Sequence, residues 1–376
     1  MMKKCLFLLM FFLSKIYAEE FLYPVAHIDN GEQLLLLYQK SLQNIELWIF
    51  DTTSHQAIKG ISSFSTPANL RIMPSGNGFS FIDQGYIKIK EFMKRSAKTI
   101  SINEPIGLFS HMNWINEDLF YFVAKEGDFF QIFQSNTQAD VTRLTNLTAD
   151  ALYPQKIGNT LFFMQRDNSG KISIMQQPWT PVPMNESKNI GKTQIIQESD
   201  QQLCYLHMIS DVAGFYIQAP HKKAHDTDCY EFFCYQLKKE ADRWENQQLF
   251  SFMIPSKYLI GAARLHESIE PFLPNYVHHN SIYFVSWDQN SMISPQFELY
   301  HFDCASHVIS NQSHLITKKY NNHMIFAPYI HEDILYCGLI TMNNDEHKKY
   351  TSIQDNSIDF DMNEGTFEIP KYRTKK

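Results

Sequence analysis

The stretch Val141–Met175, VTRLTNLTADALYPQKIGNTLFFMQRDNSGKISIM, decides the fold. It contains a proline-marked apolar strand from Leu152, a tight turn at Gly158-Asn159 and a dense apolar strand that ends at Gln165. A polar turn and a further alternating strand follow. Short apolar strands bounded by Gly and Asn are typical of antiparallel hairpins. The stretch therefore predicts an antiparallel sheet built from consecutive strands.

The same order of strands and turns recurs seven times along the chain. The copies begin near Tyr23, Leu70, Phe109, Tyr153, Leu203, Phe272 and Phe326. Their spacing is mostly near the ~40–50 residues of a propeller blade. No helical periodicity is sustained after Ala18. The sequence predicts an all-β fold, a β-propeller of seven blades, or of six if the copy near Leu70 is misread. Radial closure would leave only short, protected sheet edges.

The two ends of the chain differ from the repeats. Residues 1–18 combine Lys3 and Lys4 with a short apolar run and end in Ile-Tyr-Ala, which is typical of a cleaved signal peptide. The run is far shorter than the ~20 residues of a membrane-spanning helix. We therefore expect a signal peptide over 1–18, a propeller over 19–370 and a basic tail over 371–376. The mature protein is expected to be periplasmic or secreted, without membrane insertion.

Charge and cysteine content limit the classes of partner and site. The formal net charge is -7, and removal of the three lysines of 1–18 changes it to -10. Nucleic acids and anionic lipids need a concentrated basic face, so neither is the expected partner. Cys229 and Cys234 could form a small disulfide or could be thiols on one strand. The chain has no Cys-x-x-Cys pair, so a zinc ribbon is not indicated.

Val141–Met175 resembles a blade of the TolB-like propellers. In that family an Arg-Leu-Thr segment ends one blade, and a proline-marked strand, a tight turn and an apolar strand open the next. The residues at the matching places are Arg143, Leu144, Thr145, Pro154, Gly158 and Phe163. The family's usual Ser-Pro-Asp-Gly turn is replaced by residues 156–159. The resemblance implies a propeller and favours the periplasm. Because the first copy begins near Tyr23, soon after the predicted cleavage site, we expect the propeller to lack the N-terminal domain of TolB.

Most catalytic motifs are absent from the sequence. No Gly-x-Ser-x-Gly elbow occurs, and His266-Glu267 and His331-Glu332 each lack the second histidine of a zinc protease helix. Two long connections between strands carry the polar residues that we select as a candidate ligand site. The candidates are His221, His225, Asp226 and Asp228 in the first connection and Asp288, Gln289 and Asn290 in the second. Equivalent connections of antiparallel blades emerge on one face, so these two loops are expected to be neighbours.

The expected function is that of a non-enzymatic, monomeric binding module for a protein or peptide. Loops that vary on a rigid scaffold would supply its specificity. No metal and no cofactor are expected, because the histidines and carboxylates of the first connection are irregularly spaced. The alternative is a propeller hydrolase or lyase, lactonase-like or glycan-active, with a metal or carboxylate site. Trp114, Trp179, Trp244 and Trp287 could contact a ligand, but packing in the core is the commoner role of tryptophan.

Overall fold

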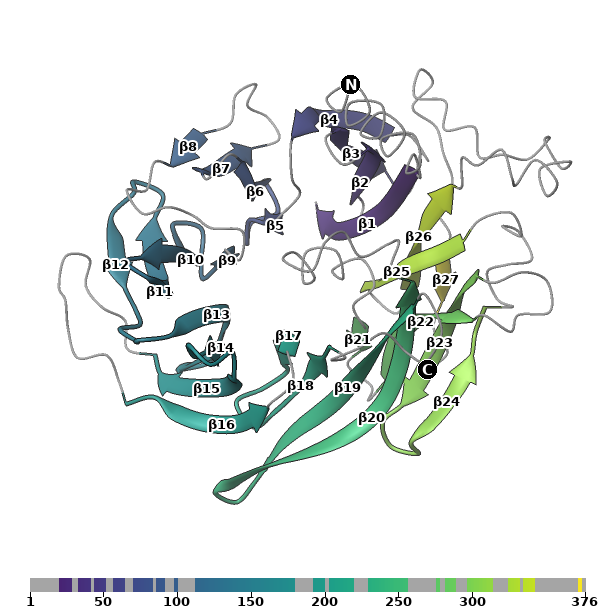
Figure 1. Ribbon diagram of the computed structural model, residues 1–376. Coiled ribbons are helices and arrows are strands. Elements are labelled where there is room, and N and C mark those ends of the chain that lie inside the picture. Colours follow the sequence, from purple (N-terminus) through teal and green to yellow (C-terminus); the bar gives the residue numbers. More distant parts are fainter. Residues whose placement is uncertain are drawn as a thin grey trace, which may run out of the picture. The chain divides into compact units, whose positions relative to one another are not determined.

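The computed structural model describes the strands and many of the turns between them. The described ranges are 20–28, 33–41, 44–51, 57–64, 70–83, 86–91, 98–100, 112–179, 192–199, 203–219, 229–255, 275–277, 281–288, 296–313, 324–331, 334–341 and 371–373. All regular structure in these ranges is β-strand (Figure 1), which confirms the predicted all-β class. Residues 1–18, the predicted signal peptide, lie outside the described residues.

The chain divides into two compact units. Unit 1 contains Met1–Thr66, Pro271–Asp303 and Val308–Lys376, and unit 2 contains Pro67–Glu270 and Cys304–His307. Each unit is built from antiparallel sheets, and in unit 2 each sheet consists of consecutive strands, the arrangement that Val141–Met175 predicts.

The described residues of unit 2 form four sheets of four strands each. The first two are β5 (Arg71–Ile72), β6 (Gly78–Asp83), β7 (Tyr86–Glu91) and β8 (Lys98–Ile100), then β9 (Met112–Trp114), β10 (Leu119–Glu126), β11 (Phe129–Asn136) and β12 (Val141–Arg143). The other two are β13 (Asp150–Ile157), β14 (Thr160–Arg166), β15 (Ile172–Pro178) and β16 (Gln194–Ser199), then β17 (Leu203–Met208), β18 (Ala213–Gln218), β19 (Cys229–Glu240) and β20 (Arg243–Pro255). Within unit 2 the first strands β5, β9, β13 and β17 lie along one side, and the fourth strands along the other (Figure 1).

Unit 1 contains two sheets. One has the order β21 (Asn275–Val277), β22 (Ser281–Asp288), β23 (Gln296–Asp303) and β24 (Val308–Asn311). The other has seven strands, which are β1 (Glu20–Ile28), β2 (Gln33–Ser41), β3 (Asn44–Asp51), β4 (Ala57–Phe64), β25 (Met324–His331), β26 (Ile334–Thr341) and β27 (Lys371–Arg373).

The seven-stranded sheet joins the first and last copies of the repeat. Glu20 of β1 pairs with Thr341 of β26, and Lys371 of β27 pairs with Tyr336 of the same strand. Part of the expected basic tail is therefore a strand. The blade number and the domain boundaries stay predictions.

The segment that decides the fold forms the predicted elements. Arg143 ends β12, the proline-marked strand is β13, and Gly158-Asn159 is the two-residue turn to β14. Gly158 has φ of +55°, the left-handed conformation that such a tight turn requires. The pairing of β13 with β14 shifts between Leu152 and Gln155, which places Pro154 at an irregularity where its missing N–H breaks no regular ladder.

Large side chains fill the space between the sheets of unit 2. Phe162 and Phe163 of β14 are both fully buried, so this strand packs on both of its faces. One core cluster continues from Tyr121 and Val123 of β10 to Leu237 of β19. Burial of each such side chain stabilises the fold by about 1.5–3 kcal/mol. Aromatic packing of neighbouring copies therefore holds the unit together.

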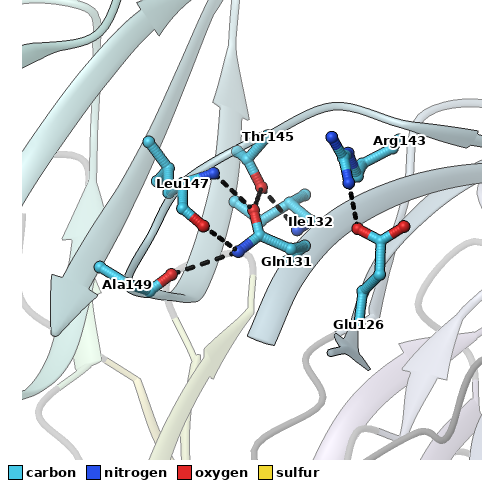
Figure 2. A network of polar contacts seen from close by, with 7 residues as sticks. All are labelled: Glu126, Gln131, Ile132, Arg143, Thr145, Leu147 and Ala149. Carbon is cyan, nitrogen blue, oxygen red and sulfur yellow. Dashed lines mark hydrogen bonds and ion pairs between the residues drawn. The ribbon is translucent and has the colours of Figure 1, made fainter. Parts of the chain in front are cut away.

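A buried glutamine fixes the connection between β12 and β13 (Figure 2). Gln131 Nε2 donates to the carbonyl oxygens of Leu147 at 3.0 Å and Ala149 at 3.2 Å. Gln131 Oε1 accepts from Thr145 Oγ1 at 2.9 Å and from the Leu147 amide at 3.1 Å. Thr145 Oγ1 in turn accepts from the Ile132 amide at 2.9 Å. The Arg-Leu-Thr segment thus has a structural role, because its threonine satisfies buried polar groups.

Candidate functional site

The loop site selected from the sequence is only partly described by the structure. His221, His225, Asp226, Asp228, Gln289 and Asn290 lie outside the described residues. Asp288 is the last residue of β22, is half-buried and pairs in register with Gln296. The structure does not test whether the two connections are neighbours. The loop site therefore stays a prediction.

Asp288 contributes to a polar environment on its own sheet. Tyr300 Oη donates to Glu298 Oε2 at 3.0 Å. Burial raises the pKa of Tyr300, and the nearby carboxylates of Glu298 and Asp288 raise it further. Tyr300 is therefore a neutral hydrogen-bond donor at physiological pH. Among the described residues, no group of three His, Cys, Asp or Glu side chains has an arrangement that could hold a metal ion.

A row of polar side chains crosses the first strands of unit 2 and includes one residue of the second strand β10. We call it the polar row, and its members are Arg71 of β5, Asn113 of β9, Tyr121 of β10, Gln155 and Lys156 of β13, and Tyr205 and His207 of β17. All except Tyr121 are half-buried. Each first strand begins a new copy of the repeat, so residues about 40 to 50 apart in the sequence meet here.

The first part of the polar row links the β5–β8 sheet to the next two sheets. Arg71 Nε donates to Asn113 Oδ1 at 3.0 Å. The Asn113 side chain also hydrogen-bonds Tyr121, whose hydroxyl accepts from the Lys156 amide at 3.2 Å. Burial raises the pKa of Tyr121. Its hydroxyl is therefore neutral, and together with the Arg71–Asn113 hydrogen bond it links three sheets.

The middle of the polar row is organised by β13. Gln155 Nε2 donates to the carbonyl of Leu206, and Gln155 Oε1 accepts from the Met208 amide at 2.7 Å. The side-chain amide of Gln155 thereby forms the hydrogen bonds with β17 that the main chain of a neighbouring strand would otherwise form. Lys156 Nζ lies 5.7 Å from the centroid of the Trp179 ring and donates to the Gly158 carbonyl at 2.9 Å. This cation–π contact fixes the ammonium without neutralising its charge.

The last part of the polar row combines aromatic faces with an imidazole. Tyr205 Oη lies 3.4 Å from His207 Nδ1, and the two rings are stacked. The His207 ring also packs against Phe215 at a centroid distance of 5.1 Å. Burial lowers the pKa of His207. The imidazole is therefore neutral at physiological pH and can both donate and accept a hydrogen bond.

The polar row was not predicted from the sequence, although a signal for it exists. Arg71 follows the predicted start of its copy at Leu70 by one residue, and Gln155 follows Tyr153 by two. A polar residue soon after the start of each copy, in an otherwise apolar strand, therefore indicates a shared surface.

Two interpretations left open by the sequence are resolved on described strands. Cys229 and Cys234 lie on β19 five residues apart, about 16 Å along an extended strand. A disulfide requires Cα atoms within about 7 Å, so the strand interpretation is confirmed.

Trp179 is buried in the core cluster, and Trp114 and Trp244 pack against core clusters. Core packing is therefore confirmed for these three tryptophans.

Within the described ranges, no helical segment has the length and hydropathy that a membrane crossing requires. No model of a protein family matches the chain, and no curated protein matches its sequence.

Comparison with solved structures shows the fold. A puromycin-hydrolyzing peptidase from Mycobacterium tuberculosis is similar with a TM-score of 0.57 and 7% identity, over 85% of this chain and 48% of the peptidase. TolB from Acinetobacter baumannii has a TM-score of 0.44 and 13% identity, over 60% of this chain and 53% of TolB. The β-propeller domain of a protease from Pyrococcus furiosus has a TM-score of 0.48 and 13% identity, over 86% and 93%.

The chain spans about half the length of the peptidase and of the Acinetobacter TolB. At these identities the comparisons concern the fold alone. The repeated four-stranded antiparallel sheets confirm the architecture that Val141–Met175 predicts. The chain has the β-propeller fold.

Proposed function

We propose that this chain is an exported, non-enzymatic β-propeller that binds a protein or a peptide. The observation that carries the proposal is the polar row, in which Asn113, Lys156 and His207 are half-buried on consecutive first strands. Side chains fixed on strands hold a binding geometry more accurately than side chains on loops. The polar row is therefore the surface to which we assign the ligand.

The chemistry of the polar row suits a polypeptide ligand. A neutral imidazole, a tyrosine hydroxyl and side-chain amides offer both donors and acceptors, which match main-chain N–H and C=O groups. The ammonium of Lys156 lies over Trp179 and has no carboxylate partner among the described residues, so an acidic ligand group would complement it.

Site-specific crosslinking tests the proposal. A photoreactive benzoylphenylalanine placed at Lys156 is expected to crosslink a protein partner in cells, with competition by excess unlabelled protein. The matched control is the same group at Lys125, an exposed lysine on β10. The identified partner is then titrated against purified Lys156→Ala and Lys125→Ala variants. We expect at least about tenfold weaker binding in the first and no change in the second.

Two results would contradict the assignment. One is equal crosslinking from positions 156 and 125, and the other is unchanged affinity in Lys156→Ala. Metal analysis of the purified protein tests the enzymatic alternative separately. A stoichiometric ion that is lost when His225 and Asp226 are replaced by alanine would favour a hydrolase or lyase.

A further inference from the structure

The fourth strands of the sheets differ in charge at their outer edges. An outer strand exposes unpaired N–H and C=O groups, and charged residues protect it from pairing with other chains. Five of the six fourth strands follow this rule. Their charged residues include Lys59 in β4, Lys98 in β8, Arg143 in β12, Glu198 in β16 and Arg243 in β20. The sixth, β24, has the sequence Val-Ile-Ser-Asn and no charge.

Two of the three exposed side chains of β24 are apolar. Val308 is 55% exposed and Ile309 is 48% exposed, and successive residues of a strand point to opposite faces. Both sides of the edge therefore present a β-branched side chain, the type that packs best against a neighbouring strand. No Asp, Glu, Lys or Arg occurs from Cys304 to Ser313. Among the described strands, only β23 pairs with β24.

Hydrogen bonds hold the edge of β24 in place. Asn311 Nδ2 donates to Glu298 Oε2 at 2.5 Å, and Asn311 Oδ1 accepts from the Ser313 amide at 2.8 Å. The Gln312 amide donates to the Leu299 carbonyl at 2.8 Å. The strand is thus anchored to β23 where it ends. A ligand strand would meet a preformed edge and would lose little free energy in ordering it.

We propose that the outer edge of β24 is a docking site for a short, uncharged, extended segment of a partner protein, which adds a further strand to the β21–β24 sheet. Main-chain hydrogen bonds would supply affinity, and Val308 and Ile309 would contact β-branched side chains of the segment. A second copy of this chain is a poorer occupant. A stable dimer buries about 1,200–2,000 Å², far more than a four-residue edge provides.

The partner segment must be uncharged because nothing on β24 would pair with a charge, and an unpaired charge at a strand contact is costly. This docking site belongs to unit 1, whereas the polar row belongs to unit 2. The inference is therefore independent of the proposed function.

Fluorescence anisotropy with a defined peptide tests the docking site. The probe is a labelled, end-blocked Thr-Ile-Ser-Val-Thr-Ile-Ser peptide titrated with the full chain. The control peptide is N-methylated at its fourth and fifth residues, which removes an N–H from each of its edges. We expect Val308→Lys and Ile309→Lys to weaken binding by about tenfold or more. The control variant is Ile195→Lys on β16, whose side chain is 50% exposed and whose strand already carries Glu198.

The possible results of this experiment either support or overturn the docking site. Binding that is lost in Val308→Lys and with the N-methylated peptide, but kept in Ile195→Lys, supports the docking site. Equal binding by Val308→Lys and the unchanged chain, equal binding of both peptides, or no binding at millimolar concentration would overturn it. A dimer in sedimentation equilibrium that Val308→Lys dissociates would also overturn it, because the occupant would then be a second copy.

Discussion

Replacement of Gln131 by methionine tests the structural role assigned to the Arg-Leu-Thr connection. Methionine has a similar volume, so the change removes hydrogen bonds without opening a large cavity. Gln131 is 3% exposed, and its amide serves the carbonyls of Leu147 and Ala149, the Leu147 amide and the Thr145 hydroxyl. All of these groups lose a partner in Gln131→Met.

The expected loss follows from the burial of the groups left behind. An unsatisfied buried donor or acceptor costs about 1–3 kcal/mol, and a hydrogen bond whose partner reaches water costs about 1 kcal/mol. Ala149 is buried, whereas Leu147 is half-buried and can gain contact with water. We therefore expect Gln131→Met to lower the free energy of unfolding by about 3–5 kcal/mol, since the separate terms are not fully additive.

The same strand offers a matched control. Gln134 is also 3% exposed and lies on β11, but its Oε1 is buried with no hydrogen-bond partner. Gln134→Met should therefore change the free energy of unfolding by less than about 1 kcal/mol. Urea unfolding of both variants, followed by circular dichroism, measures the difference. Equal losses in the two variants would refute the assignment of the stabilisation to the network of Figure 2.

Further predictions concern the main chain and pH. Gly78→Ala should lower the free energy of unfolding strongly, because a Cβ there would lie 2.5 Å from the Lys90 carbonyl oxygen. Gly127→Ala should lower it by only about 1 kcal/mol in thermal unfolding, because Gly127 has φ of +61° and a Cβ there would have no atom within 4 Å. Burial lowers the pKa of His207, so below its ordinary value of about 6.5 the unfolded chain binds a proton that the folded chain does not. The free energy of unfolding should fall by up to about 1.4 kcal/mol per pH unit as the pH is lowered from 7.5 to 5.5. The fall should be smaller in His207→Phe, which lacks this titrating group.

The repeating sheet could be predicted because its signals are local. The pattern of strand, turn and strand around Gly158 is set by residues that are neighbours in the sequence, and a two-residue turn fixes the register of the hairpin. The same reasoning placed the starts of the copies at Leu70 and Leu203, each within one residue of a first strand. Local conformational preferences and the final fold agree in these segments.

The candidate site could not be predicted in the same way. The Gln155 side chain hydrogen-bonds the main chain of Leu206 and Met208, about fifty residues later in the sequence. No local sequence pattern predicts these hydrogen bonds. The loop residues from His221 to Asp228 were selected because polar loops often carry function, which is a correlation and not a geometric argument. The spacing of the copies does imply that first strands become neighbours. It does not say which of their polar side chains meet.

First strands and fourth strands differ in chemistry, and the two proposals concern different strands. The polar row lies mainly on first strands, whereas the proposed docking site is the fourth strand β24. First strands such as β13 direct hydrogen-bonding side chains towards the next sheet, so Gln155 and its neighbours are fixed by contacts between copies. Most fourth strands carry charged residues instead, and Arg143 of β12, for example, forms an ion pair with Glu126. Val308 of β24 has an apolar side chain in place of such a charge, so an incoming strand would not have to desolvate an ion.

Because the polar row and β24 share no residue, Lys156→Ala should leave heptapeptide binding unchanged, and Val308→Lys should leave crosslinking at position 156 unchanged. If either variant affected both readouts, the effect would come from general destabilisation and not from a local surface.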